Sequence, residues 1–400
     1  MEEKTKNHVL TINGGSSSIR FAFYKIDESL ALISSGKLEN IGIESSKPIF
    51  TVNGSSRSNI AEITDNTYLI AASFLVAWLE NQDEFSKVYA IGHRIVFGMS
   101  HTNAQRITAE LIDDLKKISA YDPEHLPEEI KLIDLFRDRH PAMNQIACFD
   151  TAFHTTMPDV AKRIAIPRRF SKKGVERYGF HGLSYGYLMQ EVELLAGNEV
   201  AHGRIILAHL GNGASLAAVK DGKSIDTSMG FTPGSGFAMG SRCGDLDPGV
   251  AWYMMEFEKL NAQQFNHLVN HESGLLGISE TSSDMRELMK SESTDFRAAE
   301  AIDLFCYQVK KWIGSFSAVL GGIETLVFSG GIGENIPRIR SQICNGLDFL
   351  GIELEETQNQ KNEFVISTEK GKVRVLVIAT NEELMIARLV VQVLSHPIKK

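Results

Sequence analysis

The sequence has few cysteines, and they are not clustered. Its 400 residues contain four, and no two of them stand in a C-x-x-C spacing: Cys148, Cys243, Cys306 and Cys344. This pattern argues against a disulfide framework and against a zinc site built on cysteine. It favours a reducing compartment.

Long apolar runs are also missing. No run approaches the roughly 18 residues that are needed to span a bilayer. The N-terminus, M-E-E-K-T-K-N-H, is charged and lacks the apolar core of a signal peptide. We therefore expect a cytoplasmic protein with no membrane partner.

Positive charge is not in excess. The chain has 41 Lys and Arg against 50 Asp and Glu, which gives a formal net charge of -9. A nucleic-acid partner would require a basic face, so this balance argues against one. An anionic substrate must then be held by local arginines rather than by the overall field. The length and the 43% hydrophobic content predict a globular protein of two or three domains.

Glycine-rich turns, by contrast, occur at three places, each after a strand-like apolar run. They are N-G-G-S-S-S at 13–18, H-L-G-N-G at 209–213 and G-G-I-G-E-N at 330–335. Backbone N–H groups in such turns can cradle the phosphates of a nucleotide. Each turn alone is equally well explained by hairpin geometry, but three on strand ends indicate a phosphate-handling enzyme. We expect the third turn to open a helix at Asn335.

The tripeptide Gly222-Lys223-Ser224 is similar to the end of a P-loop but does not qualify as one. The residue five before Gly222 is Ala217, where that motif requires another glycine. The residues that follow continue as a strand, whereas a P-loop leads into a helix. We expect an ordinary hairpin turn at Asp221-Gly222.

Two strand–turn–strand units, about half a chain apart, share one plan, at 8–24 and at 204–226. Further strand patterns alternate with helical patterns along the chain. The strands are expected at 88–96, 145–150, 325–329 and 373–379, and the helices at 128–137, 184–195, 296–320 and 382–394. This order of strands and helices predicts an α/β protein with a duplicated, two-lobed architecture. We place an N-terminal lobe at 1–150 plus 384–400 and a C-terminal nucleotide-binding lobe at 151–383.

Two arginines and an aspartate stand where strands pass into loops. Arg94 lies in I-G-H-R-I-V and Arg242 in M-G-S-R-C-G-D-L-D-P. A guanidinium fork matches carboxylate and phosphoryl oxygens, so either arginine can clamp an anion. For Arg242 an ion pair with Asp245 or Asp247 is the alternative. Asp150 ends a strand in C-F-D-T-A-F-H, a usual place for a metal or substrate ligand in α/β folds.

Other polar residues have two interpretations. The side-chain amide of Asn13 is suited to a γ-phosphate or a metal-bound water. His154 and His181 are candidates for chemistry, although a lone histidine is more often a hydrogen-bonded core residue. Glu382 and Glu383 begin a helix, where capping alone would explain a glutamate.

With these segments in order, the chain resembles the acetate kinase family of carboxylate kinases, within the superfamily of sugar kinases, heat-shock chaperones and actin. The likeness runs nearly from end to end. Its pieces are I-N-G-G-S-S-S at 12–18, G-H-R-I-V at 92–96, F-D-T-A-F-H at 149–154, R-Y-G-F-H-G-L-S at 177–184, H-L-G-N-G-A-S at 209–215, D-T-S-M-G-F-T-P at 226–233, G-D-L-D-P-G at 244–249, S-G-G-I-G-E-N at 329–335 and T-N-E-E-L-M-I-A-R at 380–388.

The resemblance implies a duplicated two-domain actin-like ATPase fold, with ribonuclease H-like lobes and an interdomain active-site cleft. It implies reversible, direct in-line transfer of the γ-phosphoryl group of ATP to acetate, giving ADP and acetyl phosphate. It also implies a homodimer and a divalent cation, Mg²⁺ or Mn²⁺. The small-molecule partners would be ATP or ADP and a short-chain carboxylate.

The resemblance further assigns residues. Asn13 and Glu382 would bind the metal, and Arg94 would hold the carboxylate. Asp150 corresponds to the family's essential aspartate, and the transition-state pair would be His181 and Arg242. The ATP site would comprise Arg20, His209, Leu210, Gly211, Asn212, Gly213, Asp284, Met285, Arg286, Gly331, Ile332, Gly333, Glu334 and Asn335.

Several positions depart from the family pattern near the acid site. The family's lysine after the serine turn is Arg20 here, and H-R-V-V-H-G-G becomes H-R-I-V-F-G-M, with Phe97 and Met99. The P-L-H-N-P loop becomes P-E-H-L-P, which introduces Glu124 and brings a carboxylate toward a site for carboxylates. T-P-L-E-G becomes T-P-G-S-G at 232–236, so Gly234 and Ser235 stand where the family has a leucine and a glutamate.

A carboxylate kinase is the leading hypothesis, with acetate first and propionate close behind. An ATP-hydrolysing switch or chaperone-like module would not need Arg94, Asp150, His181 and Arg242 together, and we expect no peptide-binding domain after the last helix. A catalytically silent regulator would be expected to have lost one of these four residues, and none is lost.

Overall fold

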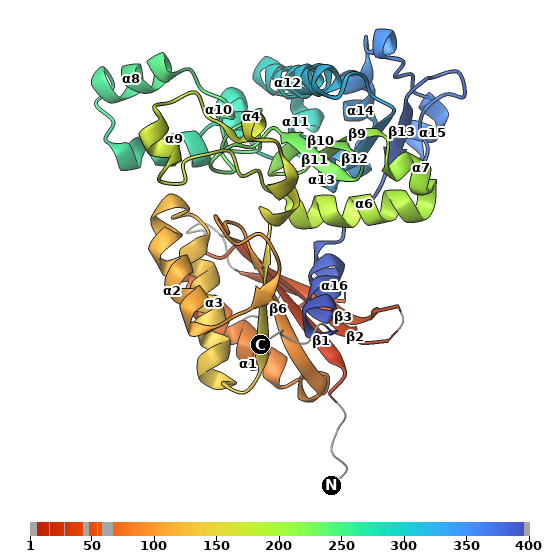
Figure 1. The fold of residues 1–400 in the computed structure, drawn as a ribbon. Helices are drawn as coiled ribbons and strands as arrows, with labels where there is room; N and C mark the ends of the chain where they lie inside the picture. Colours follow the sequence, from red (N-terminus) through yellow and green to blue (C-terminus); the bar gives the residue numbers. More distant parts are fainter. Residues whose placement is uncertain are drawn as a thin grey trace. The chain divides into compact units, whose positions relative to one another are not determined.

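The computed structural model describes residues 6–15, 17–27, 29–42, 48–53, 55–57 and 67–395. Ser16 in the first glycine-rich turn, and residues 1–5 and 396–400 of the expected N-terminal lobe, lie outside this set. The contacts define two compact units, unit 1 from Met1–Ala152 with Asn381–Lys400, and unit 2 from Phe153–Thr380 (Figure 1). The expected lobe boundaries at 150 and 384 stay a prediction.

Unit 1 is built on a mixed sheet with strand order β5-β4-β3-β2-β1-β6-β8-β7. The strands are β1 (His8–Gly14), β2 (Ser18–Lys25), β3 (Ala31–Glu39), β4 (Ile49–Val52), β5 (Ser55–Arg57), β6 (Val88–Ile95), β7 (Gln105–Arg106) and β8 (Asn144–Phe149). The helices are α1 (Tyr68–Glu80), α2 (Ala109–Ile118), α3 (Leu126–Arg139) and α16 (Glu382–Ser395), with short 3-10 turns at Phe85–Lys87 and Ser119–Tyr121.

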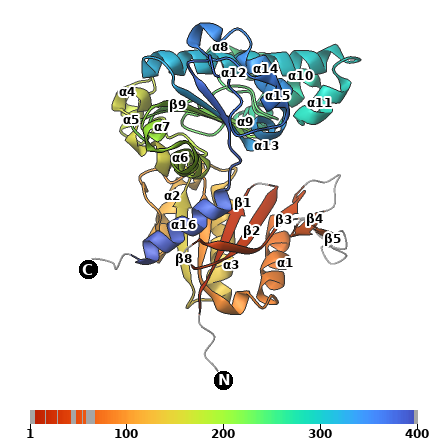
Figure 2. The same ribbon diagram turned by 90° about the vertical axis from the view of Figure 1, so that its right-hand side faces the viewer.

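Helices cover both faces of the unit 1 sheet (Figures 1 and 2). On one face, Leu10, Ile12 and Phe21 form a core with apolar residues of α1 and α3. On the other face α16 lies against β1, β6 and β8. It approaches closely because β6 carries Gly92, where a Cβ would meet Ile386 of α16 at 2.5 Å. The start of α16 is thereby fixed beside the end of β1.

Unit 2 holds a second sheet, with order β11-β10-β9-β12-β13. Its strands are β9 (Arg204–Leu210), β10 (Ala214–Lys220), β11 (Lys223–Thr227), β12 (Thr325–Ser329) and β13 (Arg374–Val377). Its helices are α4 (Asp159–Lys162), α5 (Arg168–Ser171), α6 (Gly182–Ala196), α7 (Asn198–Ala201), α8 (Pro248–Glu256), α9 (Ala262–His271), α10 (Gly274–Ser279), α11 (Met285–Ser291), α12 (Phe296–Leu320), α13 (Gly330–Asn335), α14 (Pro337–Cys344) and α15 (Glu356–Gln360), with 3-10 turns at Ala152–Thr156 and Asp348–Leu350.

The unit 2 sheet is also covered on both faces. Helix α6 packs Tyr185, Leu188 and Val192 onto apolar residues of β9, β10 and β12, while α12 lies on the opposite face (Figure 1). Strands β9, β10 and β12 are mostly apolar because both faces of the sheet are buried there.

The two sheets repeat one topology, and the predicted duplication is confirmed. In each, a central strand pairs antiparallel with the next strand of the chain and parallel with a strand on its other side: β1 with β2 and β6, and β9 with β10 and β12. The fold is the two-domain actin-like ATPase fold that the resemblance implies.

Most expected elements agree with the structure within a few residues, and the helix at 296–320 agrees at both ends. The Asp221-Gly222 turn is confirmed as a hairpin, since both residues have positive φ. The helix expected to open at Asn335 is wrong. Helix α13 begins at Gly330 and ends at Asn335, because the Glu334 carboxylate accepts the first N–H, that of Gly330, at 2.8 Å.

In the described part of the chain, no helix combines the length and the apolar character that crossing a membrane would require.

Candidate active site

Three polar side chains of unit 1 meet where neighbouring parallel strands end. Asn13 lies near the end of β1, Arg94 near the end of β6, and Asp150 directly after β8. Because β1, β6 and β8 run parallel as neighbours, their carboxyl ends share one sheet edge. Glu382, the first residue of α16, joins them from the α16 face.

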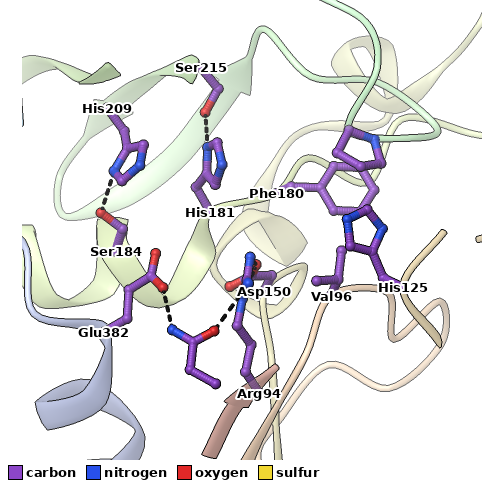
Figure 3. Close-up of polar contacts among 12 residues, drawn as sticks. Arg94, Val96, His125, Asp150, Phe180, His181, Ser184, His209, Ser215 and Glu382 are labelled. Carbon is purple, nitrogen blue, oxygen red and sulfur yellow. Dashed lines mark hydrogen bonds and ion pairs between the residues drawn. The ribbon is translucent and has the colours of Figure 1, made fainter. Parts of the chain in front are cut away.

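These four residues, which we call the arginine cluster, are joined by hydrogen bonds (Figure 3). Arg94 donates from Nε and Nη2 to Asp150 Oδ2 at 2.9 and 2.7 Å, and from Nη1 to Asn13 Oδ1 at 3.2 Å. Asn13 Nδ2 donates to Glu382 Oε2 at 2.8 Å. The sequence prediction for unit 1 therefore names residues that the fold brings together.

Arg94 and Asp150 form an ion pair inside the protein. Asp150 is fully buried, and the Arg94 side chain is 16% exposed. Burial by itself would lower the pKa of Arg94, but Asp150 and Glu382 more than offset it, so that the pKa is raised. A guanidinium has five N–H donors, and three of those of Arg94 bond to described residues. Two remain to bind the oxygens of a carboxylate.

Glu382 has a second carboxylate beside it. Burial raises the pKa of Glu383, and the adjacent Glu382 raises it further. The helix cap does not explain this pair, because Asn381 Oδ1 accepts the Leu384 N–H at 2.9 Å. Two close carboxylates thus place oxygen ligands and excess negative charge at one point, and Asn13 Nδ2 donates to both of them. A hard cation such as Mg²⁺ prefers such ligands and needs only one or two from the protein.

The described residues contain no group of three or more histidine, cysteine or acidic side chains that would enclose a metal ion by themselves. The positive charge of Arg20, on β2, lowers the pKa of Glu383 and so acts against burial and Glu382. Arg20 and Glu383 both line a cavity of about 320 Å³.

A second group lies in unit 2 around two imidazoles, and we call it the histidine cluster: His181, Ser184, His209 and Ser215 (Figure 3). His181 Nδ1 is 2.8 Å from Ser215 Oγ, which is also 2.5 Å from the Tyr185 hydroxyl. His209 Nδ1 is 2.9 Å from Ser184 Oγ. The two imidazole rings lie 4.5 Å apart between centroids.

Backbone geometry sets the position of His181. It precedes the first residue of α6 in the left-handed conformation, with φ 59° and ψ 24°. This conformation is uncommon for a residue other than glycine and often marks functional sites. His154, by contrast, is a core residue. Its ring bonds Ser224 Oγ and the Phe180 carbonyl, and burial lowers its pKa to about 4.

Arg242 and His181 converge on the H-L-G-N-G turn. A Cβ on Gly213 would lie 3.4 Å from His181 Nε2 and 3.7 Å from Arg242 Nη1, so both nitrogens face this glycine. Arg242 Nη1 donates to the Pro233 carbonyl at 3.3 Å. The carboxylates proposed as its ion-pair partners hold backbone amides, since Asp245 accepts from Gly236 N and Asp247 from Gly249 N.

The third glycine-rich turn is fastened by two charged residues. Besides Gly330 N, Glu334 Oε1 accepts the Thr380 N–H at 3.0 Å. Arg340, fully buried, donates to the carbonyls of Gly333 and Glu334 and also to Asn359 and Asn362. Arg340 was not predicted, and nothing in the sequence around it distinguishes it from a surface arginine.

The segment Asp284–Arg286 begins α11. Asp284 caps this helix by accepting the Arg286 N–H at 2.8 Å, and its carboxylate also bonds the Arg286 guanidinium. These bonds to Arg286 lower the pKa of Asp284. The exposed Arg286 side chain is therefore held in one orientation.

Residues 8–388 match the acetokinase family. The chain belongs to this family. It is 41% identical over 386 residues to the acetate kinase of Rhodopseudomonas palustris, with 95% of this chain and 96% of the relative covered. Among solved structures it is similar to Porphyromonas gingivalis acetate kinase (TM-score 0.84, 35% identity, 97% of this chain and 100% of that chain) and to a Francisella tularensis propionate kinase (TM-score 0.86, 35% identity, 96% and 98%).

Several departures from the acetokinase motifs take definite places in the fold. Phe97 is fully buried, and Met99 has a left-handed backbone with φ 48°. Glu124 is part-buried in the loop before α3. In the T-P-G-S-G segment, Ser235 Oγ is buried, and a Cβ on Gly230 would lie 2.6 Å from it.

Sequence reasoning missed several polar residues that the structure places in or beside the two clusters. Ser184 and Ser215 lie within the quoted motifs, yet a serine carries no signal that it will orient a particular histidine. His125 was also passed over, although it stands in the P-E-H-L-P motif, and its Nδ1 is 2.9 Å from Asp122 Oδ1. Glu129, in the first turn of α3, was not considered because acidic residues are ordinary at helix starts.

Proposed function

We propose that this protein is an acetate kinase, which transfers the γ-phosphoryl group of ATP to acetate and reverses the reaction. The observation that carries the proposal is the buried Arg94–Asp150 pair at the strand ends, with two guanidinium N–H groups left over. In a member of the acetokinase family, a fixed cation with spare donors is suited to hold the acceptor carboxylate.

The proposed reaction needs little covalent help from the protein. A carboxylate oxygen of acetate attacks the γ-phosphorus as the bond from that phosphorus to the β-bridging oxygen breaks, releasing ADP. Catalysis then rests on positioning and on neutralising charge. We assign Arg94 to the acetate carboxylate, Asp150 to orienting Arg94, and His181 and Arg242 to the developing phosphoryl charge. The pairing of both nitrogens around Gly213 supports the last assignment.

We assign the nucleotide to residues of unit 2 and Arg20 of unit 1. Backbone N–H groups of the turns at 209–213 and 331–335 would hold phosphates, with Asp284, Met285 and Arg286 lining the base side. Asn13 and Glu382 would hold Mg²⁺ or Mn²⁺. When bound, the metal would neutralise charge on the phosphate oxygens. ATP as substrate and four free cysteines support a cytoplasmic location.

The deciding experiment is a hydroxamate assay of purified protein with ATP, Mg²⁺ and a series of short acids. We expect acyl phosphate with acetate and less with propionate. A folded, ATP-binding sample that forms no acyl phosphate with acetate, propionate or butyrate would overturn the proposal.

The preferred acid is a separate question, since one similar solved structure is a propionate kinase. An ionised Glu124 close to the acid would repel it. We expect a high KM for acetate in the wild type and poor use of butyrate. Glu124→Leu should lower the KM for acetate. An unchanged KM in this variant would place Glu124 away from the substrate.

We also propose a homodimer, through the surface of α8. Three aromatic residues are more than half exposed there, Trp252, Tyr253 and Phe257, and their rings contact one another. Exposed apolar clusters of this kind mark interaction sites. Light scattering after size exclusion should give twice 44.3 kDa, and Trp252→Lys should shift the mass toward the monomer.

A further inference from the structure

Glu129 is a buried carboxyl group that the proposed reaction does not use. It lies in the first turn of α3 and is 3% exposed. Both of its oxygens accept the backbone N–H of Val96, Oε1 at 3.1 Å and Oε2 at 3.2 Å. Val96 is itself 3% exposed. An unpartnered buried N–H costs about 1–3 kcal/mol, so this bond has a definite structural purpose.

Val96 is the first residue after β6, two positions beyond Arg94. The chain here is fixed from two sides. The Asp150 N–H donates to the Ile95 carbonyl at 2.9 Å, which extends the pairing of β6 with β8 by one residue. Glu129 then holds the next N–H, that of Val96. These two bonds hold the carbonyl and the N–H of one peptide group, the one between Ile95 and Val96. Together they set the position of the Arg94 backbone relative to Asp150.

The loop after Val96 is closely packed and hydrogen-bonded, so it cannot absorb a displacement of the Val96 backbone. A Cβ on Gly98 would lie 2.6 Å from the Phe149 ring, and the Gly98 carbonyl accepts the His101 N–H at 2.9 Å. Met99 has a positive φ of 48°. A displacement of the Val96 backbone would therefore also displace Arg94, because the loop after Val96 is packed too closely to absorb it.

Charge does not explain why a glutamate stands here. The charged groups around Glu129 are Asp122, Arg94 and Asp150, and two of these three are also acidic. Burial and Asp122 raise the pKa of Glu129 well above its usual value, against the opposing effects of Arg94 and the Val96 bond. A carboxyl group in that setting is costly as an anion, whereas its oxygen as an acceptor has a clear partner.

We propose that Glu129 is a positioning residue of the carboxylate site, which holds the chain at Val96 and thereby fixes Arg94 for the acceptor carboxylate. This inference rests on the proposed kinase function and extends it to a residue that does not touch the substrate. The proposed role requires a side chain long enough to bring an acceptor oxygen to the Val96 N–H. It does not require a negative charge.

Two variants of Glu129 separate the effect of side-chain length from the effect of charge. Glu129→Gln keeps an acceptor oxygen at the same distance and removes the charge. Glu129→Asp keeps the charge and shortens the side chain by one methylene. We expect Glu129→Asp to raise the KM for acetate about tenfold, with the KM for ATP within twofold of wild type. We expect Glu129→Gln to stay within threefold of wild type for both.

The adjacent Glu128 gives a matched control. Its Oε1 pairs with Lys131 at 2.8 Å on the same helix turn, and no bond joins it to Val96 in the described structure. Glu128→Asp and Glu128→Gln should leave both KM values within twofold. Hydrogen-exchange mass spectrometry of peptides containing Val96 should show faster exchange in Glu129→Asp only.

The outcomes are distinct. If the wild type phosphorylates no carboxylate, the proposed function fails, and the exchange rates still report on the Val96 bond. If the wild type is active and Glu129→Asp leaves the acetate KM unchanged, the inference is overturned. It is also overturned if Glu129→Gln raises that KM as much as Glu129→Asp, or if Glu129→Asp raises the KM for ATP equally.

Discussion

The arginine cluster and the histidine cluster hold their residues by different means. In unit 1, Arg94, Asp150 and Glu382 are formal charges, and Arg94 is bonded directly to a carboxylate that is fully buried. In unit 2, His181 and His209 are each held by a serine hydroxyl, and Ser184 is further linked to Thr380 Oγ1 at 2.8 Å. One cluster orients its residues through an ion pair, and the other through hydrogen bonds to serine hydroxyls.

This difference predicts how each cluster responds to loss of a member. Removing one partner of a buried ion pair leaves the other as an uncompensated charge, which costs several kcal/mol. Removing a serine hydroxyl that bonds a histidine costs about one hydrogen bond. Substitutions in unit 1 should therefore affect folding and activity together, whereas those in unit 2 should affect mainly activity.

The largest effect is expected from Asp150→Ala. The Arg94 guanidinium would lose two bonds and its buried counter-charge, so the free energy of unfolding should fall by about 3–5 kcal/mol. Urea denaturation measures this loss, and acyl phosphate formation should disappear. The double variant Arg94→Met/Asp150→Leu should regain most of the stability without any activity. A loss of stability below about 1 kcal/mol would show that the pair is not buried as described.

Arg242→Ala tests the unit 2 side. Its proposed partner is charge that develops on the moving phosphoryl group, so kcat should fall roughly a hundredfold or more, about 3 kcal/mol. The KM for ATP should change little. Steady-state kinetics and a melting curve together decide the matter. A lower Tm with activity per folded molecule intact would instead support an ion pair with Asp245 or Asp247.

Two serine substitutions compare the two serine–histidine pairs of the histidine cluster, Ser215 with His181 and Ser184 with His209. Ser215→Ala removes the hydroxyl that orients His181, so kcat should fall by roughly fivefold, about 1 kcal/mol. Ser184→Ala removes the partner of His209, which we assign to ATP, and should raise the KM for ATP instead. Kinetics of both variants against both substrates measure this split. Identical kinetic changes in the two variants would contradict separate roles.

The smallest effect concerns pH. The pKa of Glu129 is raised in the folded protein above its ordinary value of 4.5. The folded state therefore binds the proton more tightly than the unfolded state, and this contribution to stability is present at low pH and lost as pH rises above about 4.5 toward the raised pKa. Glu129→Gln should remove that slope. Melting curves of both proteins between pH 5 and pH 8 test it, and parallel slopes would refute it.

The strand ends of the arginine cluster could be predicted because their signals are local. An apolar run followed by Asn13 or Asp150 fixes both the strand and its end. The links between distant elements could not be predicted in the same way. Glu129 reaches Val96 across 33 positions, and His181 reaches Ser215 across 34. Such pairings depend on how α3 and α6 pack, which no local pattern specifies.

The error at Asn335 has the same origin. Glycines usually end helices or form turns, so G-G-I-G-E-N predicts a turn before a helix. The structure makes it a short helix because Glu334 satisfies the first N–H, and Arg340 binds the carbonyls near its end. These two side chains override the weak helix propensity of glycine.

The bond between Asn13 and Glu382 joins residues that are 369 positions apart in the chain. A ribosome that adds about 5–20 residues per second needs tens of seconds to pass from one to the other. Until Glu382 has been added, β1 exists without α16, and Asn13 lacks the carboxylate with which we propose that it binds a metal. The site that we propose around Asn13 can therefore form only when synthesis of the chain is almost complete.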